Sequence, residues 1–219
     1  MAVPQGASAA NGGWKTVTFT APFTGGTSLS LSGCDDSTAT CNAEPSASDE
    51  GILAGTAAVS RTVPVPQATW NPTDAFTSGH YVEQLTVPRS ASTVTFSLVG
   101  TLEATGCEVH ATRGIASAAS ELMIVVVDAD DSVRRVESVN PSYCDNRNLA
   151  GSPYAFHTPL GALTLTTDSL EVQDQRGAQL TVFAALRMAG RMYDSTTRPA
   201  GSAAVSATYR VSSIVATFD

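Results

Sequence analysis

The sequence has little lysine, few aromatic residues and no hydrophobic run of membrane-spanning length. Lys15 is the one lysine among 12 basic residues, and 20 acidic residues bring the formal net charge to -8. This charge repels the backbone of nucleic acid and an anionic membrane surface. The longest apolar run, Leu122 to Val127, has strand length and falls short of the roughly 20 residues that span a bilayer. We therefore expect no nucleic-acid partner and no membrane span.

Motifs of common hydrolases are also absent. The sequence contains no Gly-x-Ser-x-Gly and no His-Glu-x-x-His, and His80, His110 and His157 are far apart. Glu103 and Glu108 have opposite parity on an expected strand, so we expect them to face opposite sides and not to form a glycosidase acid and base. A non-enzymatic role is favoured, and a secreted hydrolase remains an alternative.

The cysteines are few and widely spaced: Cys34, Cys41, Cys107 and Cys144, with no Cys-x-x-Cys pair. Neither a common zinc site nor a redox motif fits this spacing. We predict disulfides from Cys34 to Cys41 and from Cys107 to Cys144, with four reduced thiols in a cytosolic protein as the alternative.

Disulfides favour an extracellular, cell-surface or virion location. Residues 1 to 4 do not resemble a signal peptide, so either a signal was removed or the protein leaves the cell by another route, such as lysis by a phage. The preference for arginine over lysine, with much Ala, Ser, Thr, Gly and Val, is typical of a GC-rich bacterial or phage gene.

What the sequence does contain is strand periodicity. Residues 14 to 20 and 27 to 32 alternate bulky and polar side chains, which predicts a hairpin-like beginning. Residues 81 to 87 and 93 to 99, separated by a short turn, predict a second hairpin. Residues 33 to 55 are expected to be the longest irregular stretch. Further strands are expected at 57–66, where Pro64 and Pro66 indicate a sheet edge, and at 102–111, 122–127, 133–139, 163–167, 170–173, 179–186 and 204–218.

About a dozen short strands predict an all-β protein, an antiparallel β-sandwich of jelly-roll or Ig-like type, with a closed barrel as the alternative. Helical spacing at 117–123 and 182–192 competes, but β-branched neighbours favour strands. Residues 1 to 13 are expected to be a flexible lead-in and residues 14 to 219 the sandwich domain. A boundary near residues 66–79 would divide it if there were two parts.

The C-terminal segment changes its alternation. Val205 to Val211 place apolar residues at odd numbers, whereas Ile214, Ala216 and Phe218 are at even numbers. A one-residue slip turns all later side chains to the other face of a sheet. We therefore predict a long terminal strand, held in the fold or by a neighbouring subunit, with a β-bulge or bend at Ser212 and Ser213.

Residues 80 to 100, with Val87-Pro88 opening a turn before Thr93 to Leu98, resemble the bacterial pre-peptidase C-terminal domains. The run Leu122 to Asp131, an apolar strand ending in an Asp-rich turn, is similar to a strand of the same modules. The resemblance implies a secreted, non-catalytic jelly-roll module, some relatives of which bind calcium or polymers. Its departure from the family is the cysteine-containing insertion between residues 102 and 120.

Two groups of residues are candidate sites. Asp128, Asp130 and Asp131 could supply oxygen ligands to calcium, although local hydrogen bonding in a hairpin turn also explains them. Exposed aromatic rings stack on sugars, and the candidate ligand-binding residues are Trp70, Tyr143 and Tyr154. The favoured function is an extracellular interaction module with a protein or polysaccharide partner. The alternative is a structural subunit of an external assembly, such as a phage particle or a surface filament, which implies a homo-oligomer.

Overall fold

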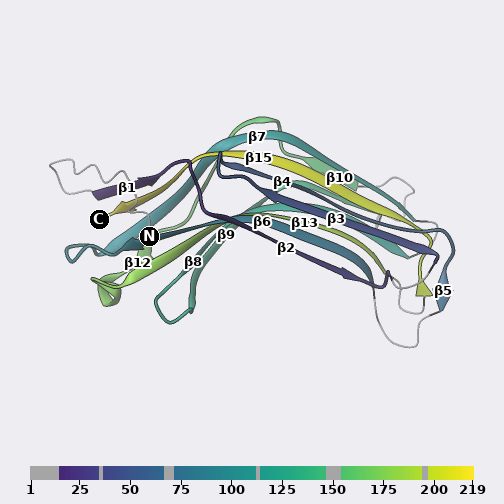
Figure 1. Cartoon of the computed structure of the whole chain (residues 1–219), viewed down its shortest axis with the longest axis horizontal. Helices are drawn as coiled ribbons and strands as arrows, with labels where there is room; N and C mark the ends of the chain where they lie inside the picture. The colour runs from purple at the N-terminus through teal and green to yellow at the C-terminus, as the bar shows by residue number, and fades with distance from the viewer. Residues whose placement is uncertain (1–14, 35–36, 67–71, 112–113, 147–153, 194–196) are drawn as a thin grey trace.

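The structure is a computed structural model, and it describes residues 15–34, 37–66, 72–111, 114–146, 154–193 and 197–219. The chain forms an antiparallel β-sandwich of two large sheets, as the strand periodicity predicted. Figure 1 shows the long strands of both sheets curving in the same direction. None of the helices in the described ranges is long and apolar enough to cross a membrane.

The six-stranded sheet has the order β10-β9-β8-β13-β6-β2. Its strands are β10 (Tyr154–His157), β9 (Val133–Asp145), β8 (Ile115–Val127), β13 (Gln179–Tyr193), β6 (Thr73–Thr86) and β2 (Gly25–Ser32).

The seven-stranded sheet has the order β11-β7-β15-β4-β3, with β1 on β15 and β12 on β7. Its strands are β11 (Gly161–Thr166), β7 (Thr93–Ala111), β15 (Gly201–Phe218), β4 (Ile52–Arg61), β3 (Ala39–Ala47), β1 (Lys15–Phe19) and β12 (Leu170–Glu171). The remaining elements are a small ribbon of β5 (Val65–Pro66) and β14 (Thr197–Arg198) and one short helix, η1 (Gln173–Gln175).

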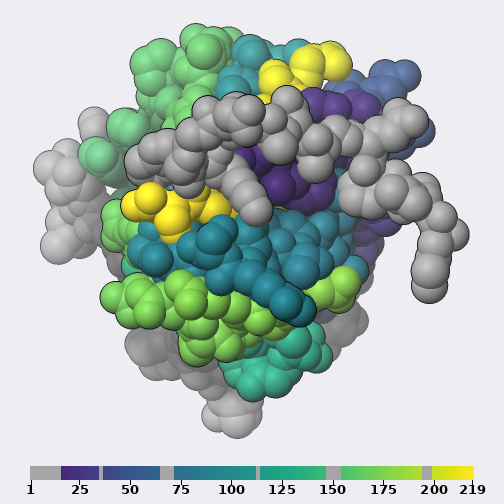
Figure 2. Space-filling model, turned by 90° about the vertical axis from the view of Figure 1, so that its left-hand side faces the viewer, coloured from purple at the N-terminus to yellow at the C-terminus, as the bar shows by residue number. Residues whose placement is uncertain are grey.

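The core lies between the sheets, where β6, β7, β8, β13 and β15 bury alternate side chains over much of their length. Figure 2, a view onto one end of the sandwich, shows residues from distant parts of the chain packed side by side there. Its largest fully buried side chains include Tyr81, Tyr209, Phe96 and Phe218. The Tyr81 hydroxyl donates to the backbone oxygen of Ser48 at 2.6 Å, and burial raises the pKa of Tyr81 to about 12. It therefore stays a hydrogen-bond donor at ordinary pH.

Tyr209 needs a glycine beside it. Its hydroxyl donates to the backbone oxygen of Leu163 at 2.7 Å, which ties β15 to β11 across β7. A Cβ atom on Gly100 would lie 2.2 Å from the backbone oxygen of Arg210 and 2.7 Å from the Tyr209 ring. Only glycine fits at position 100 without movement of the backbone.

The predicted phase change near Ser212 is a β-bulge. Val211 pairs with Gly100 and Ser213 with Val99, so Ser212 is the extra residue. Ile214 and Phe218 consequently point into the core on the far side of the bulge. β15 lies inside the sheet, which confirms the prediction of an integral terminal strand.

Both predicted disulfides are present. Cys34, just after β2, is bonded to Cys41 on β3, and Cys107 on β7 is bonded to Cys144 on β9. Each bond therefore links the six-stranded sheet to the seven-stranded sheet. The Cα atoms are 5.9 and 6.0 Å apart, within the normal disulfide range.

Both predicted hairpins are wrong in their pairing, although the strands exist. β1 pairs with β15 in one sheet, and β2 pairs with β6 in the other. β6 and β7, the strands of the second expected hairpin, also lie in different sheets. Alternation shows that a segment is a strand, but the buried area of the whole sandwich selects its partner.

Two element predictions also need correction. The stretch 33–55, expected to be irregular, contains β3, whose alternation is masked by small and polar residues. β4 ends before Pro64 and lies between β15 and β3, so it is not an edge strand. Residues 117–123 and 182–192 lie in β8 and β13, which confirms the strands that were favoured there over helices.

Candidate functional site

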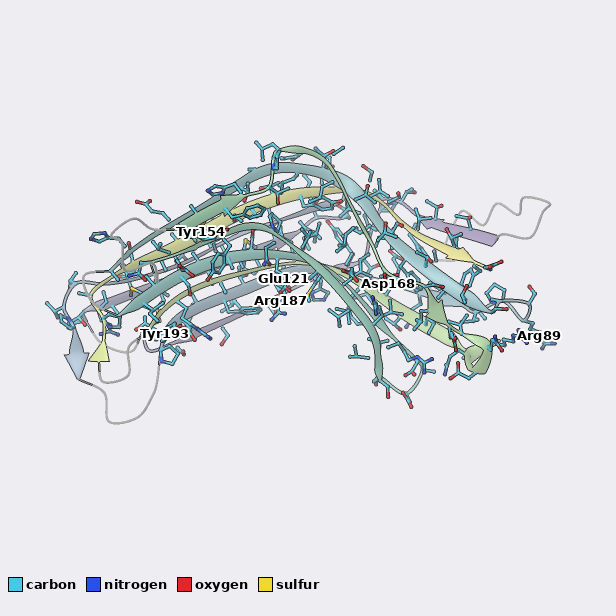
Figure 3. The ribbon with its side chains drawn as sticks, turned by 180° about the vertical axis from the view of Figure 1, so that it is seen from behind. Arg89, Glu121, Tyr154, Asp168, Arg187 and Tyr193 are labelled. Carbon is cyan, nitrogen blue, oxygen red and sulfur yellow. A yellow bond between two sulfur atoms is a disulfide. The ribbon has the colours of Figure 1, made fainter. Side chains whose placement is uncertain are left out.

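The outer face of the six-stranded sheet gathers aromatic and charged side chains from five strands. We call this face the platform. It lies on the inner side of the curve in Figure 1, and Figure 3 shows four of its side chains, Glu121, Arg187, Tyr193 and Tyr154. The remaining residues of the platform are Asp74, Phe76, Ser117, Ala119, Tyr143, Asp145, Phe156, Ala189 and Arg191.

One row of the platform is aromatic at both ends and small in the middle. In neighbouring strands Phe76 pairs with Ala189, Ala189 with Ala119, Ala119 with Tyr143, and Tyr143 with Phe156. Adjacent strands are about 4.8 Å apart, so Phe76 and Tyr143 lie about 14 Å apart. The two alanines between them form a low apolar floor between the aromatic side chains.

Two ion pairs flank this row. Arg191 makes a bidentate contact with Asp74, at 2.9 Å from Nε to Oδ1 and 3.0 Å from Nη2 to Oδ2. Arg187 lies 3.5 Å from Glu121 through Nη1 and Oε2. The Arg187 guanidinium also stacks over the Phe76 ring, 4.9 Å from its centroid. The charged groups are thereby held in defined orientations by partners on neighbouring strands.

Two of the three predicted ligand-binding aromatics meet on the platform. The rings of Tyr143 and Tyr154 are 6.2 Å apart between centroids, tilted by 54°. The Tyr143 hydroxyl donates to Asp145, whereas the Tyr154 side is open and the residue is 52% exposed. Trp70, the third predicted aromatic, lies outside the described residues.

Sequence reasoning missed Phe76, Phe156, Arg187 and Arg191. Each lies at an outward position of an alternating strand, and this is the only signal that could have found them. Alternation does not say which strands are neighbours, so it could not bring Phe76 near Arg187, more than 100 residues later.

The three aspartates proposed as calcium ligands lie in the turn between β8 and β9. Asp128 and Asp130 each accept a hydrogen bond from the backbone N–H of Ser132, at 3.0 Å. The contact between these carboxyls raises the pKa of Asp128 and lowers that of Asp130. Asp131 adopts a positive φ of 64°, typical of such a turn.

Within the described ranges, no group of three His, Cys, Asp or Glu side chains is arranged to hold a metal ion. The hydrogen bonds to Ser132 fit the hairpin-turn alternative, and calcium binding stays a prediction.

The expected orientation of Glu103 and Glu108 is wrong. β7 has a register irregularity opposite Thr208 and Tyr209, so that Glu103 is an extra residue. Glu103 pairs with Arg210, and both glutamates are exposed on the outer face of the seven-stranded sheet. A bulge reverses the inward and outward alternation of all later residues in the strand. The number of residues between Glu103 and Glu108 does not show that a bulge lies there.

The histidines do not converge. His80 lies on the platform side of β6, 6.3 Å from the Phe183 ring; His110 is on β7 in the other sheet; and His157 is on β10.

The outer face of the seven-stranded sheet carries a shallow depression of about 460 Å³. Its lining is small and mostly uncharged, with residues such as Ala54, Gly55, Ser206 and Thr208 and one carboxylate, Glu44. It lacks aromatic side chains, so it offers a ligand little apolar contact. The platform is the better candidate site.

The fold and the platform define a β-sandwich with an extended, open candidate binding face. No protein-family model and no curated protein matches the chain, so the resemblance to pre-peptidase C-terminal domains stays a prediction.

Among solved structures, the chain is similar to TmCBM61 in complex with β-1,4-galactotriose, with 8% identity and a TM-score of 0.25 over 80% of this chain and 89% of the other. It is also similar to TmCBM27, a carbohydrate-binding module described for mannan recognition, with 8% identity and a TM-score of 0.27 over 91% and 99%. At these values the similarity does not bear on the function of this chain, and the fold is established by its own strand pairing.

Proposed function

We propose that the protein is a non-enzymatic binding module that takes a polysaccharide on the platform. The observation that carries the proposal is the row from Phe76 to Phe156, in which aromatic rings border a floor of alanine. The C–H faces of sugar rings pack on aromatic side chains, and the floor admits a flat chain without steric conflict. The open face suits a polymer that extends beyond the site at both ends.

The polar groups of the platform match the hydroxyls of a sugar. A guanidinium presents several N–H donors in one plane, and a carboxylate accepts from one or two hydroxyls. Because Asp74 and Glu121 hold Arg191 and Arg187 in place, little side-chain entropy is lost on binding.

The charge of the platform favours a neutral glycan over an acidic one. Each of its two arginines already has a carboxylate partner, and Asp145 adds a third acidic group. The one lysine of the chain, Lys15, lies on β1 in the other sheet. Among the described residues of the platform both arginines are already paired with carboxylates, so they attract a uronic acid or a sulfated sugar only weakly, and the net charge of -8 would repel it.

Action outside the cytoplasm is part of the proposal. Two disulfides link the sheets, and such bonds persist in oxidising compartments. The disulfides favour any oxidising compartment and do not distinguish a cell surface from a virion. A cell-surface or virion location and an origin in a bacterium or phage are further parts of the proposal.

The test is titration calorimetry with soluble galactan, mannan and β-glucan, and with polygalacturonate as the acidic polymer. We expect binding to at least one neutral polymer, with little change between low and high salt. Tyr154→Ala and Phe156→Ala should each weaken it at least tenfold without lowering the melting temperature, since both side chains are about half exposed.

Leu160→Ala is the matched control, because Leu160 is 60% exposed and lies in the turn before β11. Absence of binding to every neutral polymer would overturn the proposed function. Binding that persists in both aromatic variants would place the site elsewhere, and tighter binding to polygalacturonate would contradict the preference for a neutral glycan.

A further inference from the structure

β2 is a fully exposed edge strand. It ends the six-stranded sheet, with β6 on one side and no strand of the described chain on the other. All five residues from Thr27 to Leu31 are exposed. Unpaired N–H and C=O groups on such an edge can pair with a further strand, and proteins usually block them with charge, proline or short length.

None of these protections is present on β2. Its eight residues, Gly25 to Ser32, contain neither a charged residue nor a proline. The other described edges differ: β3 carries Glu44 and Pro45, β10 has only four residues, and β11 buries its Leu165 in the core. β2 therefore stands apart in its length, its neutrality and its exposed leucines.

Leu29 and Leu31 are exposed by 57% and 44% on the same side of β2. They pair with Thr77 and Ala75, which face the interior, so both leucines lie on the side of the seven-stranded sheet. They remain exposed because that sheet does not cover them. Ser28 and Ser30 point to the platform side, opposite Ser78 and Phe76. One side of the edge is thus apolar and the other carries hydroxyls.

We propose that β2 is a dimerisation edge whose partner is β2 of a second copy of this chain, antiparallel and related by a twofold axis through Ser30. In this register Leu29 of each copy lies opposite Leu31 of the other copy. Ser30 faces its own symmetry mate, and Ser28 faces Ser32. Every apolar side chain meets an apolar one, which is the self-complementarity that a twofold interface requires.

Charge directs a second copy to this edge instead of to other parts of the surface. The net charge of -8 disfavours close approach of two copies over most of their surfaces, whereas β2 brings two uncharged strands together. A strand of eight residues is only about 26 Å long, so the pair buries well under the roughly 1,200 Å² of a stable interface. The dimer is therefore expected to be weak and dependent on concentration.

The same register joins the two platforms. Ser30 pairs with Phe76 of β6, so the aromatic row continues through Ser30 and its symmetry mate to Phe76 of the second copy. The twofold axis is perpendicular to the sheet, which keeps both platforms on one side. The dimer stands independently of whether the platform binds a glycan.

Sedimentation velocity from about 1 to 200 μM tests the association. We expect the mass to rise from 22.5 kDa toward twice that value. The Thr24 backbone oxygen accepts from the Val82 N–H, so even-numbered residues of β2 bond to β6 and odd-numbered ones face the open edge. Leu31→Pro therefore removes an edge N–H and Leu29→Lys adds a charge, and each should keep the chain monomeric at unchanged melting temperature. Leu160→Lys, on an exposed turn, should dimerise like the wild type. A chain that stays monomeric throughout, or that grows beyond the dimer, overturns the proposal.

Cysteine cross-linking tests the register. All four native cysteines are in disulfides, so an added cysteine is the only free thiol. Ser30→Cys should form a disulfide-linked dimer on mild oxidation, because residues opposite each other across antiparallel strands are about 5 Å apart. Ser28→Cys should not, since its symmetry mate lies about 13 Å away, but it should link to Ser32→Cys in a mixture. Equal cross-linking of both single variants would overturn the twofold axis at Ser30.

Discussion

The disulfide from Cys107 on β7 to Cys144 on β9 joins the two sheets and also orients the platform. Because Cys144 points inward to reach Cys107, its neighbours Tyr143 and Asp145 must point outward. A bond between the sheets therefore determines which side chains of β9 lie on the platform side.

We predict that loss of this disulfide is the costlier of the two losses. Replacing Cys107 and Cys144 together by serine should lower the free energy of unfolding by about 3 to 4 kcal/mol, and the same change at Cys34 and Cys41 by about 2 to 3 kcal/mol, because the first bond closes the longer loop. Urea unfolding of both double variants measures this. Equal losses, or a Cys34 to Cys107 peptide in a non-reducing digest, would contradict it.

A second prediction concerns the glycine beneath Tyr209. Gly100→Ala should lower the free energy of unfolding by about 1 to 3 kcal/mol or more, since the new Cβ would meet a backbone oxygen at 2.2 Å. Gly106→Ala on the same strand is the control, because its Cβ would have no contact closer than 3.4 Å. Similar melting temperatures for the two variants would show that β7 relaxes freely at position 100.

The third prediction is a pH dependence of stability at Glu83. Desolvation raises the pKa of this carboxyl, on an inward position of β6 beside Tyr81 and Leu85. Below the unfolded pKa the group is neutral in both states and has no effect. As the pH rises through the folded pKa, the folded state must ionise a partly buried group, and stability falls.

Glu83→Gln should therefore be more stable than the wild type at pH 7, with the difference vanishing near pH 3. Chemical denaturation at several pH values measures it, and Glu108→Gln, at an exposed carboxylate of β7, is the control. A constant difference at all pH values would assign the effect to packing instead of ionisation.

The fourth prediction separates binding from stability on the platform. Arg187→Met keeps an apolar stem but removes the guanidinium over Phe76, and we expect the proposed neutral glycan to bind about tenfold more weakly, or about 1.4 kcal/mol. The free energy of unfolding should change by less than about 0.5 kcal/mol, because the ion pair is partly exposed.

Arg210→Met gives the matched control, since Arg210 pairs with Glu103 on the outer face of the other sheet. If both variants bind as tightly as the wild type, Arg187 does not contact the ligand. Equal losses of binding would point to a general effect of charge.

β3 and β10 were not predicted as strands. The sequence by itself determined most of the other strands, the fold class, the disulfide pairing and the bulge. Each of these depends on local information: alternation with period two, the proximity of Cys34 to Cys41, which left Cys107 for Cys144, and the change of parity at Ser212. The aromatic pair of Tyr143 and Tyr154 was also within its reach, because both lie close to one disulfide in the chain.

Only the tertiary structure decided which strands are neighbours. Backbone hydrogen bonds between strands do not depend on side-chain identity, so β1 can pair with β2 or with β15 until the burial of the whole core selects one. That selection placed β6 beside β13 and Phe76 under Arg187, and it left β2 with β6 as its single neighbour among the described strands. The platform and the open edge are both products of long-range pairing, which no local pattern in the sequence encodes.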